Sequence, residues 1–163
     1  LLGWSYDQWH AELALFAPFL AFFKHYKAAC EFIWAAFILG IICCIIYTIW
    51  PSLPPASVIH THNFSSGCYE CINRYWAIHE FGHYVLTACG LVDFPSYHAL
   101  MAMLMIWFSW SFKWLRWPFL IFNVLVILST FLLGFHFLID VIASLAILAA
   151  YYTIYRYVKV AKA

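Results

Sequence analysis

Charged residues are scarce in this sequence. Lysine and arginine number 8, aspartate and glutamate number 7, and together they make up 9% of the 163 residues. Soluble domains are roughly one quarter charged, and the small number of charges here cannot cover a water-facing surface. An ordinary cytosolic enzyme is therefore excluded. The net charge of +1 provides no basic patch, so we expect no nucleic-acid partner. Disorder is excluded as well, because aromatic residues form 22% of the chain.

Long apolar runs take the place of the missing charge. Hydrophobic residues make up 67% of the chain and give a mean hydropathy of +0.88. A helix needs about 20 residues to cross the hydrocarbon core, and runs near that length cover residues 9–23, 28–50, 96–112, 118–134 and 136–155. We therefore predict an all-α fold, a polytopic transmembrane helix bundle with five spans. Residues 1–163 would form one membrane domain, in which the polar, proline-interrupted residues 51–93 are a loop or interfacial segment on the outer side.

The distribution of basic residues predicts the orientation of these spans. With five crossings, one side of the membrane receives nearly all lysines and arginines, and the other side receives Arg74 alone; the first group is Lys24, Lys27, Lys113, Arg116, Arg156, Lys159 and Lys162. Cytoplasmic loops carry such an excess, so the basic side is predicted to be cytoplasmic. We expect a multi-pass protein of a bacterial inner membrane. Because the chain begins at Leu1 on the outer side, we also expect a sixth helix upstream of it.

Three ionisable residues inside the apolar runs mark a candidate site, because such groups are costly in a bilayer. His136 and Asp140 are four residues apart and therefore share one helix face. His98 begins another span, and the predicted topology places all three at the outer ends of their helices. The carboxylate could accept one ring N–H of His136 and leave the other nitrogen as a nucleophile, while His98 protonates a leaving oxygen. Ser96 could cap its helix and donate to a phosphate. A buried His–Asp hydrogen bond with a purely structural role is the alternative.

Two stretches of sequence carry a resemblance to a known family. Residues 94–98 read F-P-S-Y-H, and Ser129, His136 and Asp140 follow the spacing S-x6-H-x3-D. These stretches resemble the second and third motifs, P-S-x-H and S-R-x5-H-x3-D, of the type 2 phosphatidic acid phosphatase superfamily. F-P-S-x-H is typical of the branch that includes inositol phosphorylceramide synthase and its bacterial relatives. The resemblance covers residues 91–150 well and the earlier helices by topology alone.

The resemblance implies a membrane lipid phosphotransferase or lipid phosphate phosphatase that works through a phosphohistidine, without metal or other cofactor, at the extracytoplasmic face. By that resemblance His136 is the nucleophile, Asp140 orients it, and His98 is the general acid. The substrate would be a phospholipid or lipid phosphate, and a lipid or sugar alcohol could be the acceptor.

Two departures from the family pattern concern the cations that hold the phosphate. The arginine of the third motif is replaced by Thr130, and the first motif, K-x6-R-P, is missing because no arginine in this chain precedes a proline. Arg74, the lone fixed cation predicted on the outer side, could replace them, although an ordinary interfacial arginine is the alternative. The departures favour a transferase over an ordinary phosphatase.

A different motif indicates a second function. His79, Glu80 and His83 form H-E-x-x-H, the pattern in which two histidines bind zinc and the glutamate activates water. An intramembrane metalloprotease is therefore the alternative function. No glutamate follows position 80 to supply a third zinc ligand, and Asp93 or Asp140 could serve instead.

The outer segment also contains His60 and His62 followed by Cys68 and Cys71. These residue types suit a metal, and an oxidised Cys68–Cys71 pair would be stable on an oxidising face. Solvated loop residues without a partner are the alternative. A non-enzymatic membrane scaffold remains a third class of function.

Overall fold

The structure is a computed structural model that describes residues 1–80, 82 and 92–161. These residues form helices and no strands. In chain order the elements are α1 (Leu2–Phe22), α2 (Tyr26–Ile49), the short 3-10 helix η1 (Pro55–Ser57), α3 (Ser66–His79), α4 (Tyr97–Ser109), α5 (Arg116–Leu132) and α6 (Leu138–Ala161). The predicted all-α class is therefore confirmed.

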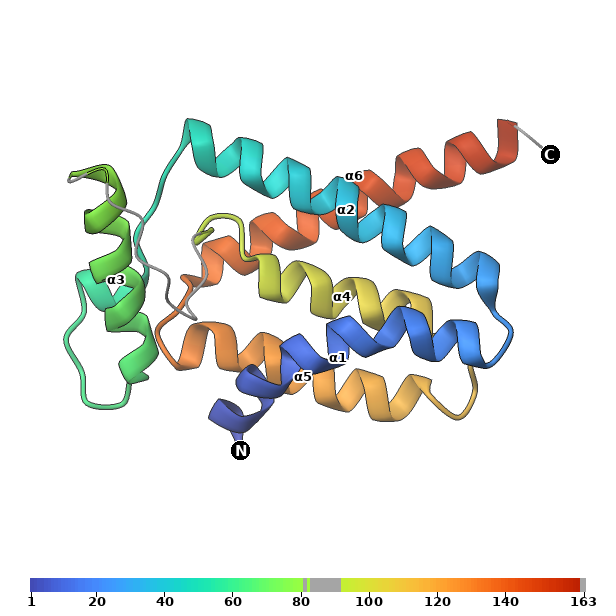
Figure 1. Ribbon diagram of the computed structural model, residues 1–163, viewed down its shortest axis with the longest axis horizontal. Helices are drawn as coiled ribbons and strands as arrows, with labels where there is room; N and C mark the ends of the chain where they lie inside the picture. Colours follow the sequence, from blue (N-terminus) through green and yellow to red (C-terminus); the bar gives the residue numbers. More distant parts are fainter. Residues whose placement is uncertain (81, 83–91, 162–163) are drawn as a thin grey trace.

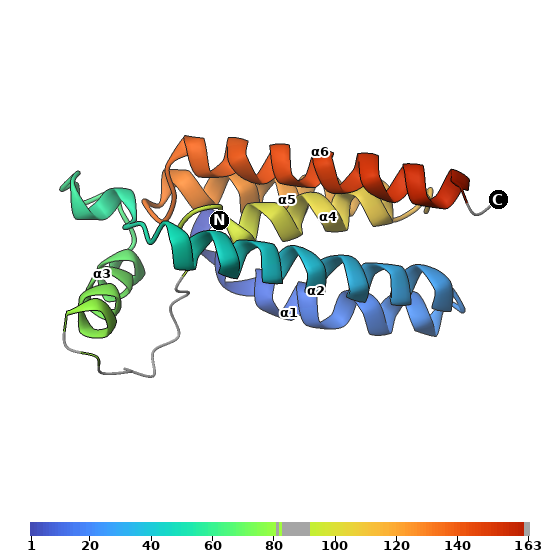
Figure 2. The same cartoon turned by 90° about the horizontal axis from the view of Figure 1, so that it is seen from above.

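The five helices α1, α2, α4, α5 and α6 run lengthwise beside one another and alternate in direction, while α3 lies at one end of this bundle (Figures 1 and 2). The chain turns between α1 and α2 and between α4 and α5 at one end, which we name the basic end because Lys24, Lys27, Lys113 and Arg116 lie in or beside these turns. The first turn of α1, the start of α4 and the start of α6 lie at the opposite end, beside α3; we name this the site end.

Helix length agrees only in part with the predicted five spans. α2 and α6 are each 24 residues long and apolar enough to cross a membrane. α4 and α5 are apolar but shorter, with 13 and 17 residues. At 1.5 Å per residue α4 is about 20 Å long, less than the roughly 30 Å of a hydrocarbon core. The serine cap at Ser96 and the turn that follows Ser109 set its ends.

α4 forms the centre of the bundle rather than its surface. It packs against α1, α2, α5 and α6, and Leu100, Met101, Leu104 and Met105 are completely buried. The outer faces of α2 and α6, in contrast, expose large apolar side chains, among them Trp34, Phe37, Leu145 and Ile154. Apolar groups thus lie both inside and outside, as expected for helices that face lipid.

The turn between α5 and α6 depends on Gly134. Its φ of +84° is in the left-handed region, and a Cβ added there would lie 2.5 Å from Cγ of Phe64. Phe64 belongs to the segment before α3, so this close approach joins α3 to the α5–α6 turn. A side chain at position 134 would have to displace an aromatic ring and adopt a strained backbone conformation.

Gly134→Ala is therefore expected to lower the free energy of unfolding by about 3 kcal/mol. Gly3→Ala is the matched control, because a Cβ at Gly3 meets nothing within 4 Å and alanine favours a helix. Thermal unfolding in detergent micelles, followed by tryptophan fluorescence, measures both variants. Equal midpoints for the two would contradict the role of Gly134.

Candidate active site

His98 lies in the first turn of α4 at the site end. Ser96 is the N-cap of this helix, and its side-chain oxygen accepts the Ala99 N–H at 3.3 Å. The imidazole of His98 is 9% exposed, and its Nδ1 is buried with no hydrogen-bond partner in the described part of the chain. One ring nitrogen is thus left for a proton or a substrate oxygen.

His136 lies in the turn before α6 and is held on two sides. Its backbone N–H donates to the Thr130 carbonyl at 2.9 Å, and its Nδ1 lies 2.8 Å from the carbonyl oxygen of Asp93. A carbonyl can only accept, so Nδ1 carries the proton and Nε2 carries the lone pair. The ring is 3% exposed. The structure therefore presents Nε2 of His136 as the free base.

Asp140 occupies a different position from the one expected from the sequence. Its Oδ2 lies 3.8 Å from Nδ1 of His136, which is too long for a hydrogen bond. The same oxygen accepts the Phe137 backbone N–H at 2.7 Å and thereby caps the start of α6. The ring N–H of His136 goes to the Asp93 carbonyl instead, and Asp140 supplies a nearby negative charge.

The two imidazoles come together although they belong to separate helices. The ring centroids of His98 and His136 are 5.9 Å apart. Reacting atoms in a poised complex approach to about 3–3.5 Å, so one tetrahedral phosphate could contact both rings. Ser96 connects the start of α4, which carries His98, to α6, which follows His136. Its N–H donates to the Asp140 carbonyl at 3.4 Å, and its carbonyl accepts the Ser144 hydroxyl at 2.9 Å.

Aromatic side chains from α1 surround His98, and sequence reasoning missed them. Tyr6 stacks on His98 with centroids 4.6 Å apart and on Phe135 at 4.2 Å. Trp9 lies 4.4 Å from His98, and His10 meets it edge-on at 5.7 Å. Tyr6 thus fills the space between His98 and the residue next to His136. The spacing of Tyr6, Trp9 and His10 on one helical face was a signal that could have indicated a common partner.

The carboxyl group of Asp93 lies beside the site, in the segment before α4. Burial, together with the nearby charge of Asp140, raises the pKa of Asp93 to about 8. At neutral pH this carboxyl is therefore mostly protonated, which reduces the negative charge that a phosphate would meet. Above pH 8 it ionises, and repulsion of a phosphate would increase.

The residues considered for binding the phosphate differ from one another in their surroundings. Ser96 is completely buried, and its hydroxyl serves the helix cap. Thr130, at the position of the family arginine, is also buried and donates its hydroxyl to the Ile127 carbonyl at 2.7 Å. Arg74 lies on α3 at the site end and is 7% exposed. Arg74 is therefore a cation at the site end.

The described residues of the zinc motif, His79, Glu80 and Gly82, do not continue one helix. α3 ends at His79, and Glu80 is its C-cap residue. Gly82 has a φ of +61°, a left-handed conformation that interrupts a helix, and His83 lies outside the described residues. His79 stacks on Tyr75 at 4.1 Å. Within residues 1–80, 82 and 92–161, no three histidine, cysteine, aspartate or glutamate side chains are grouped to hold a metal.

The Cys68–Cys71 disulfide, one of the alternatives that the sequence left open, does not form. Cys68 is a buried free thiol, and its Sγ donates to the Ser65 and Leu133 carbonyls at 2.6 and 3.3 Å. Since both partners are backbone oxygens, this thiol joins the start of α3 to the α5–α6 turn.

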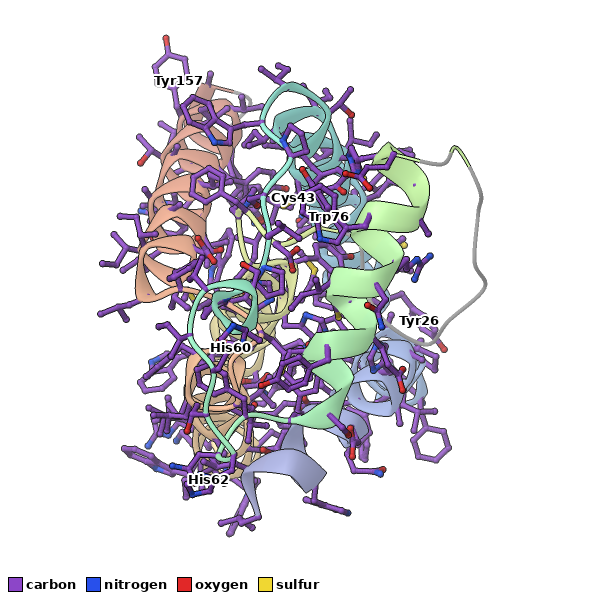
Figure 3. All side chains as sticks on the ribbon, turned by 90° about the vertical axis from the view of Figure 1, so that its left-hand side faces the viewer. Tyr26, Cys43, His60, His62, Trp76 and Tyr157 are labelled. Carbon is purple, nitrogen blue, oxygen red and sulfur yellow. The ribbon has the colours of Figure 1, made fainter. Side chains whose placement is uncertain are left out.

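Figure 3 views the molecule from the site end and shows His60 and His62 on the loop before α3.

Comparison with known proteins identifies the family. A family model described as the PAP2 superfamily matches residues 1–154, most of the chain. No curated protein and no solved structure matches it significantly. The match covers α1 and α2 as well as the two motifs around His98 and His136. The chain therefore belongs to the PAP2 superfamily, which makes it an enzyme of the phosphatase and phosphotransferase type.

Proposed function

We propose that this protein is a membrane lipid phosphotransferase or lipid phosphate phosphatase that acts through a phosphohistidine on His136. The observation that carries the proposal is the pair of imidazoles 5.9 Å apart, one of which has a fixed tautomer. A histidine whose Nδ1–H is engaged by a carbonyl presents Nε2 as a nucleophile. The second imidazole is close enough to exchange a proton with the departing or incoming oxygen.

The first half-reaction transfers the phosphoryl or phosphodiester group to the enzyme. Nε2 of His136 attacks phosphorus and forms the N–P bond, while the bond from phosphorus to the leaving oxygen breaks and its electron pair stays on that oxygen. Protonated His98 donates its proton to this oxygen, so an alcohol leaves. The negative charge of Asp140, 3.8 Å from Nδ1, stabilises the positive charge that develops on the ring of His136.

The second half-reaction regenerates the enzyme. A water or alcohol oxygen attacks phosphorus, the N–P bond breaks with its electron pair returning to Nε2, and neutral His98 takes the proton of the attacking hydroxyl. Water as acceptor yields a phosphatase, whereas a lipid or sugar alcohol yields a transferase. We favour the transferase, in the branch that resembles inositol phosphorylceramide synthase, because Thr130 supplies no cation to hold an inorganic phosphate product.

A cavity beside Asp140 supports a lipid as substrate. It measures 360 Å³ between the end of α2 and the start of α6, and apart from Ser52 and Asp140 its lining is apolar or aromatic: Trp50, Leu53, Phe94, Phe137 and Ile139. An acyl chain fits such a lining, and the carboxylate at its edge belongs to the site. Arg74 is the candidate for binding the phosphate. The basic residues at the opposite end support a site at the extracytoplasmic face, because cytoplasmic loops carry an excess of lysine and arginine.

Trapping of the intermediate tests the proposal. Purified protein incubated with phospholipids labelled with ³²P is expected to form an acid-labile, base-stable phosphoenzyme, equally with and without a chelator such as EDTA, because the reaction needs only imidazoles. The label is measured after rapid denaturation and gel electrophoresis. Absence of any labelled enzyme in the presence of turnover, or loss of turnover on chelation, would contradict the mechanism.

A further inference from the structure

A second cavity lies at the basic end of the bundle, away from His98 and His136. It measures 480 Å³, and its walls come from α2, the end of α4 with the turn after it, and the last turns of α6. α2 and α6 both pack on α4, and Figure 2 shows them on either side of it. The lining residues used below are Glu31, Trp107, Phe108, Tyr152, Tyr155, Arg156 and Lys159.

The polar groups of this cavity form a network between two helices. Oε2 of Glu31 accepts the Tyr155 hydroxyl at 2.8 Å, and Oε1 lies 3.6 Å from Nζ of Lys159. Lys159 in turn donates to the Tyr155 oxygen at 2.8 Å. The charges of Lys159 and Glu31 therefore compensate each other. The cavity is left with the single positive charge of Arg156.

Arg156 has no carboxylate partner within the described part of the chain. Its guanidinium lies over the ring of Tyr152, 5.9 Å from the centroid. A guanidinium placed on an aromatic ring still directs its N–H groups outward in the plane, which suits two oxygens of one phosphate. The cavity is thus complementary to a group with a single negative charge.

Aromatic side chains form most of the remaining walls, beside Ala28, Ser111 and Val160. Trp107 meets Tyr152 and Tyr155 edge-on, with centroids 5.0 and 5.5 Å apart, and Phe108 lines the apolar part. Tryptophan and tyrosine are typical of the headgroup level of a bilayer, since their rings are apolar and their N–H or O–H groups are polar. Large apolar side chains are exposed along both flanking helices, where acyl chains would lie.

We propose that this cavity binds a phospholipid of the leaflet at the basic end, with its phosphodiester on Arg156 and its chains along α2 and α6. A phosphodiester carries one negative charge at neutral pH, which matches the charge that the network leaves uncompensated. The bound lipid is a ligand and not a substrate, because the cavity is at the opposite end of the bundle from the two imidazoles. This proposal does not depend on the catalytic mechanism.

Native mass spectrometry of the whole chain in detergent, titrated with dioleoylphosphatidylglycerol, tests the proposal. Arg156→Gln is expected to weaken binding about tenfold, which is the effect of losing one charge-assisted hydrogen bond. Arg116→Gln is the matched control, since Arg116 lies at the same end and over a ring, 5.5 Å from the Trp117 centroid, but does not line the cavity. It is expected to bind like the unmodified protein.

Three outcomes would overturn the proposal. Equal weakening in both variants would mean general attraction between basic residues and anionic lipid. No saturable binding to the unmodified protein would exclude a site. Glycerol 3-phosphate competing as tightly as the lipid would mean that the ligand is a soluble phosphate. Thermal unfolding of each variant, measured alongside, separates loss of the site from loss of the fold.

Discussion

Turnover of the lipid substrate is expected to fall at least about 10⁴-fold in His136→Ala, and the labelled phosphoenzyme is expected to disappear. The physical reason is that the structure offers Nε2 of His136 as the free base beside a second imidazole, with Nδ1 fixed on the Asp93 carbonyl at 2.8 Å. Without that nitrogen, the acceptor would have to attack the substrate directly, and one difficult step would replace two easier ones.

His79→Ala is the matched control for this prediction. His79 lies at the site end on α3, and its Nδ1 interacts with the Tyr75 carbonyl at 2.9 Å, outside the group formed by His98 and His136. Activity within a few-fold of the unmodified enzyme is expected. Both variants are assayed with the same lipid after their thermal unfolding midpoints have been compared. An active His136→Ala enzyme would refute the nucleophile, whereas an inactive His79→Ala enzyme would show that the assay responds to any histidine at this end.

The relative directions of the helices could be predicted from the number of apolar runs and the positions of the basic residues between them. Basic residues that gather in alternate turns require the starts of α4 and α6 to lie at the same end, and the structure has this arrangement (Figure 1). His98 and His136 each precede or begin one of these helices, so their meeting follows from topology and motif spacing. What topology could not supply was the 5.9 Å separation, which depends on how α4 and α6 pack.

The partner of His136 could not be predicted from residue types. Asp140 has the right spacing for a side-chain hydrogen bond, but its carboxylate caps α6 through the Phe137 N–H. A free helix N-terminus competes for the nearest acceptor, and the imidazole finds the Asp93 carbonyl, 43 residues earlier. Every residue has a backbone carbonyl, so no sequence pattern marks this one.

Helix length could not be predicted from apolar composition, for a physical reason. Apolar composition predicts burial away from water, but it does not distinguish lipid from protein interior. Residues 97–109 are apolar because α4 is enclosed by the other helices, whereas residues 26–49 are apolar because α2 also faces outward. The same composition therefore gives a 13-residue central helix and a 24-residue surface helix.

His98→Ala is expected to lower the rate with a substrate that has a poor leaving group far more than the rate with a substrate that has a good one. With a natural lipid, turnover should fall about 10²–10⁴-fold, because an alkoxide leaves poorly unless it is protonated as the bond breaks. With a p-nitrophenyl phosphate ester, phosphoenzyme formation should stay within a few-fold of the unmodified enzyme, since p-nitrophenolate is stable without a proton. The label should then accumulate, because the base for the second half-reaction is missing as well.

Quenched-flow measurement of the labelled enzyme, together with p-nitrophenolate release, follows both half-reactions in one experiment. His98→Asn is made alongside, because the ring stacks on Tyr6 and contacts Trp9, and its removal leaves space that Asn fills in part. The split between substrates is expected in both variants if the ring acts by moving a proton. Equal loss with natural and activated substrates in both would instead mean that His98 only supports the fold around Tyr6. Since a structural defect cannot depend on the acidity of a leaving group, the ratio of the two rates decides between these roles.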